Sequence, residues 1–373
     1  MDGLTAAFRG IRKPFEFRTY PVPDPEPGAV VLRMRLANVC GSDLHYWRGD
    51  ADLAGRGFTL PCTLGHEGVG EIYRIGTGVT TDSAGHPVRE GDRVVFQYFD
   101  PCGQCATCLK GHVFACPYRQ KERLREIEQW PHFRGTFAQY YYLYPNHTMF
   151  KVADGLHDGL VASVNCAVAQ VISGFDRARL TPGESVAIQG LGGLGLYATA
   201  FAKACGAHPI IAIDGIDDRL RLARNFGADH TIDIRASSTA DTRVQEVQSY
   251  TRGLGTDITL ELVGHPAVVA EGIDMTAPAG RFVEIGNINV GWDARCDPSR
   301  AVLRSVSLIG VAHYRPRDLA SAIAFVTRKA QTLPLDQILA KRFNLLDINE
   351  AFALQNDGLV TRSALVPHPS SNA

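Results

Sequence analysis

The chain has 373 residues, 45% of them apolar, and its 38 basic and 39 acidic residues give a net charge of −1. This length is sufficient for two domains that each bury a core. The near-neutral charge and the lack of a basic run argue against nucleic acid as a partner. The start, Met1 to Leu4, does not resemble a signal peptide, and the apolar stretches are too short and interrupted for a membrane span. We therefore expect a soluble, cytoplasmic protein.

Up to about residue 165, short β-like runs alternate with turns. Examples are 29–34, 68–73 and 92–96, and prolines crowd the connection at 21–28. This spacing predicts a compact β-rich domain.

After residue 180 the pattern changes to strands that alternate with helices. Strands are predicted at 185–189, 210–214, 257–263 and 280–286, with helices between the glycine turn and about 205 and at 218–226. This order predicts a parallel sheet wound in βαβ units. The remaining tail, with helices at 319–329 and 348–355, is too short to fold alone. The predicted α/β organisation is a β-rich domain at 1–167, a doubly wound domain at 168–312 and a segment at 313–373 that returns to the first domain.

A glycine turn marks a nucleotide site. Gly190-Leu191-Gly192-Gly193-Leu194-Gly195 fits G-x-G-x-x-G, it lies between a predicted strand and a predicted helix, and Asp214 ends the next strand. The glycines permit a close approach of pyrophosphate, and the helix N-terminus supplies N–H donors. Asp214 would accept hydrogen bonds from the adenosine ribose and repel a 2′-phosphate, which favours NAD over NADP. The alternative is that the glycines serve only close packing of helix and sheet.

Nine cysteines, an odd number, argue for metal or catalysis rather than a disulfide framework. Four of them, Cys102, Cys105, Cys108 and Cys116, form a C-x2-C-x2-C-x7-C pattern in a lobe at about 97–120. Four thiolates enclose a structural zinc ion without an open position. An iron–sulfur cluster and a chance group of free thiols are the competing interpretations.

A second possible metal set is dispersed along the chain. Cys40, His66 and Cys166 supply two thiolates and one imidazole, which is a known catalytic zinc set with an open fourth position. Each residue alone also has a plain structural explanation, as a small buried thiol or a core histidine.

With these motifs together and in order, the sequence resembles the zinc-containing medium-chain alcohol dehydrogenases over essentially its whole length. The resemblance implies a GroES-like catalytic domain, a Rossmann domain and two zinc ions per chain. It assigns Cys40, His66 and Cys166 to the catalytic zinc, with Glu67 as a conditional ligand. It also implies further NAD contacts, which are Leu194, Arg219, Val263, Ile285, Gly286 and Asn287.

The resemblance further implies roles in proton transfer. Asp43 matches the acid that hydrogen-bonds the zinc histidine and fixes its tautomer. Ser42 matches the hydroxyl that receives the alcohol proton, and His45 is either a relay to solvent or an ordinary polar residue. Two positions depart from the family pattern: Asn165 precedes Cys166, and Gln170 replaces a small hydroxyl residue that touches the nicotinamide.

The expected reaction is hydride transfer between an alcohol and NAD. Trp47, Tyr98 and Phe99 are candidates for the substrate pocket, although each also suits a core position. Aromatic walls favour a secondary or cyclic alcohol. Polyol dehydrogenases of the superfamily, which often have glutamate at the position of Cys166, are the alternative.

Two further alternatives are a zinc-free quinone or enoyl reductase of the superfamily and a catalytically silent NAD-binding redox sensor. The resemblance also implies a homodimer or homotetramer that pairs through the sheet near 281–291 or 302–311. The charged segment 118–134 is expected to be a surface helix rather than part of the substrate entrance.

Overall fold

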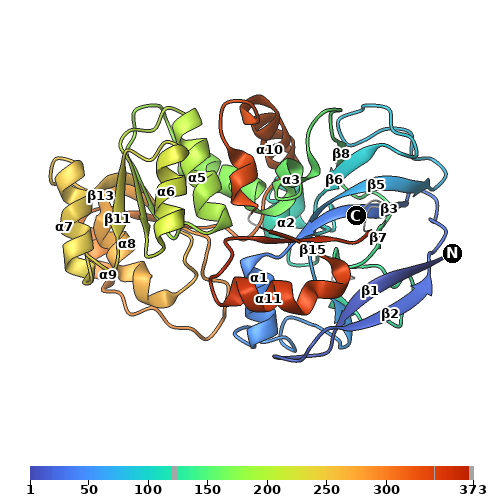
Figure 1. The fold of residues 1–373 in the computed structure, drawn as a ribbon. Helices are drawn as coiled ribbons and strands as arrows, with labels where there is room; N and C mark the ends of the chain where they lie inside the picture. The colour runs from blue at the N-terminus through green and yellow to red at the C-terminus, as the bar shows by residue number, and fades with distance from the viewer. Residues whose placement is uncertain (120–123, 340, 369–373) are drawn as a thin grey trace. The chain divides into compact units, whose positions relative to one another are not determined.

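The computed structural model describes residues 1–119, 124–339 and 341–368 (Figure 1). The chain divides into two compact units. The first unit comprises residues 1–166, 315–328 and the chain from 339 onwards, and the second comprises 167–314 and 329–338.

The first unit is rich in β-structure. A seven-stranded sheet has the order β15-β16-β3-β5-β6-β8, with β7 pairing to β3, and a three-stranded sheet has the order β2-β1-β4. Apart from the parallel pair β15–β16, the strand pairs in these sheets are antiparallel. The strands are β1 (Asp2–Phe8), β2 (Glu16–Pro21), β3 (Val30–Asn38), β4 (Cys62–Thr63), β5 (Glu67–Ile75), β6 (Arg93–Phe96), β7 (Tyr140–Leu143), β8 (Met149–Lys151), β15 (Lys341–Asn344) and β16 (Ser363–Val366).

The helices of this unit are short apart from one in the C-terminal part of the chain. They are α1 (Gly41–Arg48), α2 (Ala106–Leu109), the 3-10 turn η1 (Val113–Ala115), α3 (Asp158–Val161), the π-helical turn η3 (Val164–Val168), α10 (Pro316–Lys329), the 3-10 turn η6 (Leu345–Asp347) and α11 (Ile348–Asn356).

An aromatic cluster joins the two ends of the chain within the first unit. Phe352 of α11 is fully buried, and its ring centroid lies 4.8 Å from that of Phe15 and 5.7 Å from that of Phe137. Burial of large aromatic rings is the main source of stabilisation in such a contact. The C-terminal segment therefore completes a core begun by the N-terminal strands.

The second unit contains a six-stranded parallel sheet with the order β11-β10-β9-β12-β13-β14. Its strands are β9 (Val186–Gln189), β10 (Ile210–Asp214), β11 (His230–Asp233), β12 (Thr256–Glu261), β13 (Thr276–Glu284) and β14 (Ser307–Gly310). Its helices are α4 (Ala169–Ala178), α5 (Gly193–Ala204), α6 (Asp217–Asn225), α7 (Ala240–Tyr250), α8 (Val269–Met275) and α9 (Pro298–Leu303), with 3-10 turns η4 (Pro266–Val268) and η5 (Leu335–Ile338).

Helices cover both faces of this parallel sheet. A Cβ atom at Gly174 of α4 would lie 3.5 Å from Val283, whereas one at Gly272 of α8 would lie 2.4 Å from Phe282. Because neighbouring residues of a strand point to opposite faces, α4 and α8 lie on opposite sides of β13. The predicted doubly wound parallel sheet is confirmed, and the strand order reverses between β9 and β12.

The sequence predicted that the whole C-terminal segment, 313–373, returns to the first domain. Only part of it does so. Residues 329–338 belong to the second unit, where η5 packs against α5. The first unit contains residues 315–328, which hold all of α10 but its last residue, and the chain from 339 onwards.

The expected surface helix at 118–134 is not found in the part of that segment that the structure describes. Residues 120–123 lie outside the described residues, and 124–134 form turns and loop rather than an α-helix. Ile127, Phe133 and Arg134 are buried, and Arg134 donates a hydrogen bond to the carbonyl of Glu126 over 3.0 Å. Burial of Ile127 and Phe133 and the hydrogen bond of Arg134 thus stabilise residues 124–134 as a loop.

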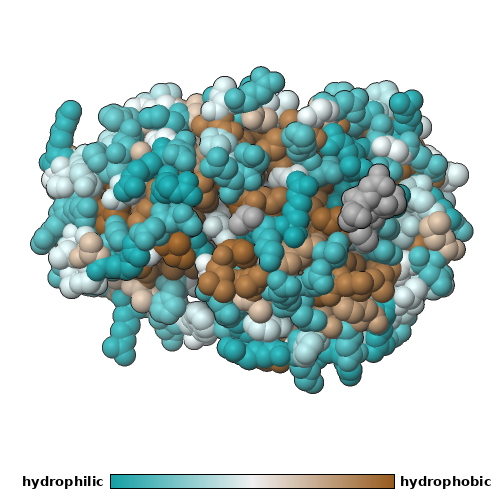
Figure 2. Space-filling view, in the orientation of Figure 1, coloured by the Kyte–Doolittle hydropathy of each residue, from teal (hydrophilic) through white to brown (hydrophobic). Residues whose placement is uncertain are grey.

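One described helical stretch, Asp158–Ala178, is long and apolar enough to cross a membrane, and 89% of its apolar window is buried inside the protein. Its burial accounts for its composition. On the face drawn in Figure 2, hydrophilic residues cover most of the surface and apolar residues form smaller groups between them.

Candidate metal and cofactor sites

The four cysteines of the predicted structural site lie together in the first unit. Their sulfur atoms are all within 4.8 Å of one another. The Sγ atom of Cys116 lies 3.5 Å from that of Cys102 and 3.9 Å from that of Cys105. Tetrahedral coordination with Zn–S bonds of about 2.3 Å requires sulfur separations of about 3.8 Å. The residues present therefore fit a zinc ion closely.

Two of these thiols, Cys102 and Cys108, have shifted pKa values. Hydrogen bonds from the backbone N–H groups of Gln104 and Cys105 lower the pKa of Cys102 to about 6. Burial, followed by contact with Cys116 and Cys105, raises the pKa of Cys108 to about 12. Because thiolates are the metal ligands, zinc binding at this lobe displaces protons at neutral pH.

The dispersed set also comes together. Cys40, His66, Glu67 and Cys166 are all buried, and their ligand atoms lie within 4.8 Å of one another. Glu67 Oε1 is a buried carboxylate oxygen with no hydrogen-bond partner among the described residues. Two sulfurs, one imidazole and an orphaned carboxylate oxygen form a donor set that suits zinc.

Three separate segments position these ligands. Cys40 is the N-cap of α1, His66 immediately precedes β5, and Cys166 lies in the π-helical turn η3. Single π-turns within helices are often found at functional sites.

Asp43 links two of these segments. Its Oδ2 accepts a hydrogen bond from the backbone N–H of Cys40 over 3.0 Å, and its Oδ1 lies 3.4 Å from Nδ1 of His66. Burial alone would lower the pKa of His66, but the charge and hydrogen bond of Asp43, together with Cys40, raise it to about 9. The ring is therefore oriented with Nδ1 toward Asp43, which leaves Nε2 for a metal.

The hydrogen bonds of Asn165, the unusual residue before Cys166, give a physical reason for its presence. Its side-chain NH₂ donates to the carbonyl of His66 over 3.0 Å, and its side-chain oxygen accepts from the N–H of Gly68 over 3.3 Å. Asn165 thus ties the turn that carries Cys166 to the segment that carries His66.

Arg362, which the sequence analysis missed, is the cation of this site. It is buried and forms an ion pair with Glu67 Oε2. A hydrogen bond with Cys166 and the charges of His66 and Arg362 hold the pKa of the Cys40 thiol well below its usual range, although burial opposes this shift. Arg362 lies 295 residues from Glu67 in sequence, so no local pattern could have indicated it.

Two candidate proton carriers lie on α1, next to the metal ligands in sequence. Ser42 is half-buried. His45 Nδ1 lies 2.8 Å from Asp50 Oδ2, so this histidine is a fixed, half-buried residue rather than a freely exposed one.

The three aromatic candidates occupy two environments. The ring centroid of Tyr98 lies 4.8 Å from that of His66, and Phe99 packs 5.3 Å from Tyr98. Trp47 instead packs against the core cluster that contains Phe352, and its Nε1 donates to the carbonyl of Lys13. The structure therefore brings Tyr98 to the ligand His66, with Phe99 packed on Tyr98, and gives Trp47 a core contact.

The glycine turn of the second unit is shaped as predicted. Gly190 has a φ of +88°, and a Cβ atom at Gly195 would lie 1.9 Å from the carbonyl oxygen of Gly190. A Cβ atom at Gly192 would meet nothing within 4 Å. Gly193 and Leu194 then begin α5. The turn thus leaves open space beside its backbone at a helix N-terminus, which fits a pyrophosphate group.

Asp214 ends β10 beside this turn. Its Oδ2 accepts from the N–H of Leu191 over 2.7 Å, and its Oδ1 accepts from the N–H groups of Gly215 and Ile216. Arg219 Nη1 lies 3.6 Å from Asp214 Oδ2. Asp214 therefore fixes the glycine turn, and Arg219 is the ion-pair partner of Asp214.

The remaining predicted cofactor residues follow β12 and β13. The N–H of Val263 donates to Glu261 Oε1 over 2.6 Å, and a Cβ atom at Gly286 would lie 2.5 Å from the N atom of Gly264. Ile285 is buried, and Asn287 Nδ2 donates to Glu284 Oε1 over 3.2 Å. These residues thus lie at the carboxyl ends of adjacent strands.

Gln170, the other departure from the family pattern, is on α4. Its side-chain NH₂ donates to the carbonyl of Ala312 over 2.9 Å. On the same helix, Ser173 donates to the carbonyl of His313 and Arg177 to that of Gly310. The side chain of Gln170 therefore helps to hold the segment that follows β14.

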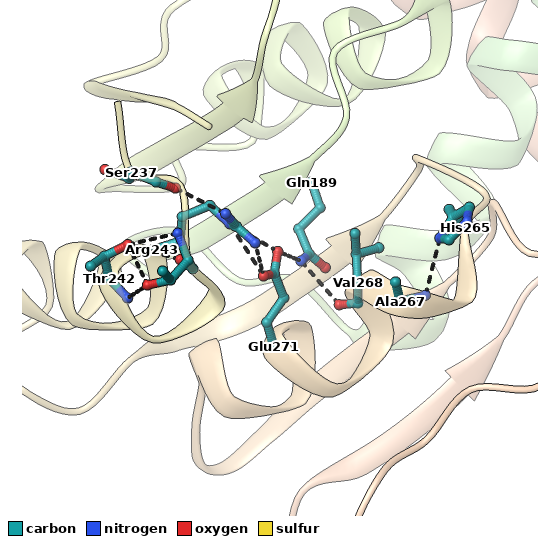
Figure 3. Close-up of polar contacts among 9 residues, drawn as sticks. Gln189, Ser237, Thr242, Arg243, His265, Ala267, Val268 and Glu271 are labelled. Atoms are coloured by element: carbon teal, nitrogen blue, oxygen red, sulfur yellow. Dashed lines mark hydrogen bonds and ion pairs between the residues drawn. The ribbon is translucent and has the colours of Figure 1, made fainter. Parts of the chain in front are cut away.

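A buried polar network fixes the strand that leads into the glycine turn (Figure 3). Gln189, the last residue of β9, donates to Glu271 Oε1 over 3.0 Å and to the carbonyl of Val268 over 3.2 Å. Arg243 of α7 forms an ion pair with Glu271 of α8. Because a buried charge is stable only when it is paired, these contacts keep the two helices in register with β9.

Comparison with known proteins identifies the family. Residues 26–154 match the model of the alcohol dehydrogenase GroES-like domain, and residues 193–328 match that of the zinc-binding dehydrogenases. The chain is 31% identical over 346 residues to the 5-exo-hydroxycamphor dehydrogenase of Pseudomonas putida, covering 92% of this chain and 93% of that one. It is 30% identical to the sorbitol dehydrogenase of Bacillus subtilis, over 76% of this chain and 75% of that one.

A solved structure is similar over almost the whole chain. The alcohol dehydrogenase of Thermotoga maritima superposes with a TM-score of 0.90 at 25% identity, covering 98% of this chain and 99% of that one. The chain therefore belongs to the zinc-dependent medium-chain alcohol dehydrogenases, as its motifs predicted. It is an oxidoreductase that acts on alcohols with zinc and a nicotinamide cofactor.

The four-cysteine lobe can be tested by removing one buried ligand. We expect Cys116→Ala to lose one of two zinc ions per chain and to lower the free energy of unfolding by about 3 kcal/mol or more. Metal analysis and urea unfolding measure both effects. Cys205→Ala, which removes a thiol outside both sets, is the control. Unchanged zinc content in the Cys116 variant would show that the lobe does not hold a metal in this way.

Proposed function

We propose that this enzyme is an NAD-dependent dehydrogenase of secondary or cyclic alcohols, with its catalytic zinc held by Cys40, His66 and Cys166. The observation that carries the proposal is the meeting of these ligands, from three separate segments, with Glu67 in one buried cluster. Three protein ligands leave a fourth position for an alcohol oxygen. Glu67, whose other oxygen is paired with Arg362, is a conditional ligand.

Zinc held in this way supplies Lewis-acid activation, which lowers the pKa of a bound alcohol. The protein's own residues must then remove the alcohol proton. We assign Ser42 to accept this proton and His45 to pass it to solvent. The contact of His45 with Asp50 supports the relay, because the carboxylate orients the ring. Asp43 acts through His66, by holding the ring in one tautomer.

The charges beside the glycine turn support NAD over NADP. Asp214 presents a carboxylate where the adenosine ribose is expected, and its negative charge opposes a 2′-phosphate. The nearby arginines already have acidic partners: Arg219 pairs with Asp214, and Arg235 pairs with Asp217 and Asp233. Their charge is therefore largely neutralised within the protein.

The residues around His66 support a substrate with an apolar or ring-shaped body. Tyr98 is a buried aromatic side chain that contacts the ligand His66, and the buried Phe99 packs on Tyr98. The relative named for hydroxycamphor agrees with this choice. A polyol is the second candidate, favoured by the similarity to a sorbitol dehydrogenase, but Cys166 supplies a thiolate where polyol enzymes often have glutamate.

The outer edge of the parallel sheet supports a homo-oligomer. β14 is an edge strand, and Val302, Leu303 and Leu308 are respectively 73%, 85% and 62% exposed at or near it. Exposed apolar residues at a sheet edge are typical of a surface that pairs with another chain. We also place the enzyme in the cytoplasm, in agreement with the lack of disulfide bonds among the described cysteines.

Removal of Cys166 tests the catalytic metal set. Cys166→Ala should lower turnover about a thousandfold or more, because metal activation contributes several kcal/mol to catalysis. NADH affinity should change by less than about twofold, because the glycine turn is untouched. Alcohol-dependent NADH formation and NADH fluorescence titration measure the two effects, with the buried Cys62→Ala as control. Full activity and full zinc content in Cys166→Ala would contradict the ligand assignment.

Neutralising Asp214 tests the choice of cofactor. We expect Asp214→Asn to raise the ratio of kcat/KM with NADP to that with NAD by about tenfold, because repulsion of the 2′-phosphate is lost and Arg219 is released. Asp218→Asn removes an exposed carboxylate from α6, the helix that carries Arg219, and should leave this ratio unchanged. A wild-type enzyme that prefers NADP would overturn the assignment.

A charge on the edge strand tests the oligomer. Leu308→Glu should convert a dimer or tetramer to a smaller species, because a buried carboxylate without a partner is unfavourable. Light scattering of the eluted protein measures this change, and Leu359→Glu, at an exposed residue of the first unit, is the control. A wild-type monomer at micromolar concentration would contradict the proposal.

A further inference from the structure

Three polar residues form a row across the centre of the parallel sheet. Gln189, Glu261 and Glu284 are the last residues of β9, β12 and β13, and they are direct register partners. Residues in register on neighbouring strands point to the same face. Phe282, two residues before Glu284, contacts α8, so the row lies on the α8 side of the sheet. Two carboxyl groups are therefore neighbours at the carboxyl edge of the sheet.

These two carboxyl groups hold the loops that follow their strands. Glu261 Oε1 accepts from the N–H groups of Val263 and Gly264, over 2.6 and 2.7 Å. Glu284 Oε1 accepts from the N–H of Asn287 over 3.1 Å. The side-chain NH₂ of Asn287 donates to both acids, at 3.2 Å each. The two acids and Asn287 thus form one connected unit.

The pair has little to balance two negative charges. Glu261 is fully buried, and among the described residues neither acid has a basic partner. On the packed elements of this face, Arg243 of α7 and Glu271 of α8 neutralise each other. Arg177 of α4 lies on the opposite side, where it donates to the carbonyl of Gly310. Glu284 Oε2 is buried without a partner.

A buried carboxylate and an adjacent half-buried one cannot both ionise readily, and sharing one proton resolves the repulsion. Burial, followed by the hydrogen bond and charge of Glu284, raises the pKa of Glu261 to about 9. A shared proton also accounts for the orphaned oxygen, because it supplies the missing hydrogen bond.

We infer that Glu261 and Glu284 share a single proton at neutral pH and act as positioning residues for the cofactor loops 262–264 and 285–287. This inference rests on the proposed NAD site, because Val263 and Ile285 to Asn287 are residues assigned to it. When the proton leaves, two like charges face each other beneath both loops. The loops then separate, and the cofactor binds more weakly.

The sign of the pH dependence follows from the raised pKa. The ordinary pKa of a glutamate side chain is 4.5, and that of Glu261 in the folded protein is about 9. Between these two pH values the folded protein holds a proton that the unfolded chain has lost. Stability contributed by the pair therefore falls as pH rises through this window. Cofactor affinity falls above it, when the folded pair ionises fully.

Glu284→Gln tests the inference, because the introduced amide supplies an N–H to Glu261 at every pH. We expect the NADH dissociation constant of the wild-type enzyme to rise about tenfold more than that of Glu284→Gln between pH 8 and pH 10. Asp241→Asn, at an exposed acid of α7, should follow the wild type. In infrared spectra at pH 7, the wild type should show a carbonyl band of a protonated carboxylic acid that Glu284→Gln lacks.

Other outcomes overturn the inference. Equal pH dependence of NADH binding in the wild type and Glu284→Gln would do so, and so would an infrared band that is absent from the wild type or unchanged in the variant. If the zinc-loaded enzyme bound NADH only with an added metal cation, a cation rather than a shared proton would balance the charge of the two carboxylates. Failure of the wild type to bind NADH at any pH would instead contradict the proposed function, and the infrared comparison would still test the proton.

Discussion

Buried negative charge is the constraint on which the first unit depends. Cys40, Asp43 and Glu67 are all inside the protein, where an unbalanced charge is strongly unfavourable. Arg362 and His66 balance part of this charge, and a divalent metal ion held by the ligand atoms would balance more of it. Arg362, which immediately precedes the C-terminal strand β16, is therefore as much a part of the site as the segments that carry the ligands.

The second unit places its acids at strand ends, where backbone N–H groups stabilise them. Asp214 binds the N–H of Leu191 in the glycine turn, and Glu261 binds those of Val263 and Gly264. In each case one carboxyl group fixes a loop that must approach a cofactor. The same chemistry that makes these buried acids stable thus shapes the nucleotide site, and the Arg243–Glu271 pair anchors the strand before the turn.

The sequence predicted the features whose signals are local. The glycine turn with Asp214, the four-cysteine lobe and the alternating strands are readable because their residues follow one another at short spacings, and β10 has the predicted bounds. The dispersed set of Cys40, His66 and Cys166 has no such spacing, and only the family resemblance assigned it to one metal. Arg362 was missed because its partner is distant in sequence, and Asn165 was noted only as a departure until its bonds to His66 and Gly68 were seen. The helix predicted at 118–134 was wrong for the described residues, because side chains such as Arg134 bond to the local backbone instead. Trp47, one of three aromatic candidates, is partly buried and packs against the core cluster, a contact that residue type alone does not predict.

The central claim is that an alcohol and NAD react at a zinc ion held by Cys40, His66 and Cys166. The most direct measurement is NADH and NADPH formation from a panel of secondary, cyclic and polyol substrates, with and without a zinc chelator. The account predicts NADH formation that is fastest with secondary or cyclic alcohols, is lost with the chelator and returns when zinc is restored. Alcohol oxidation that persists at full rate after both zinc ions are removed would contradict it.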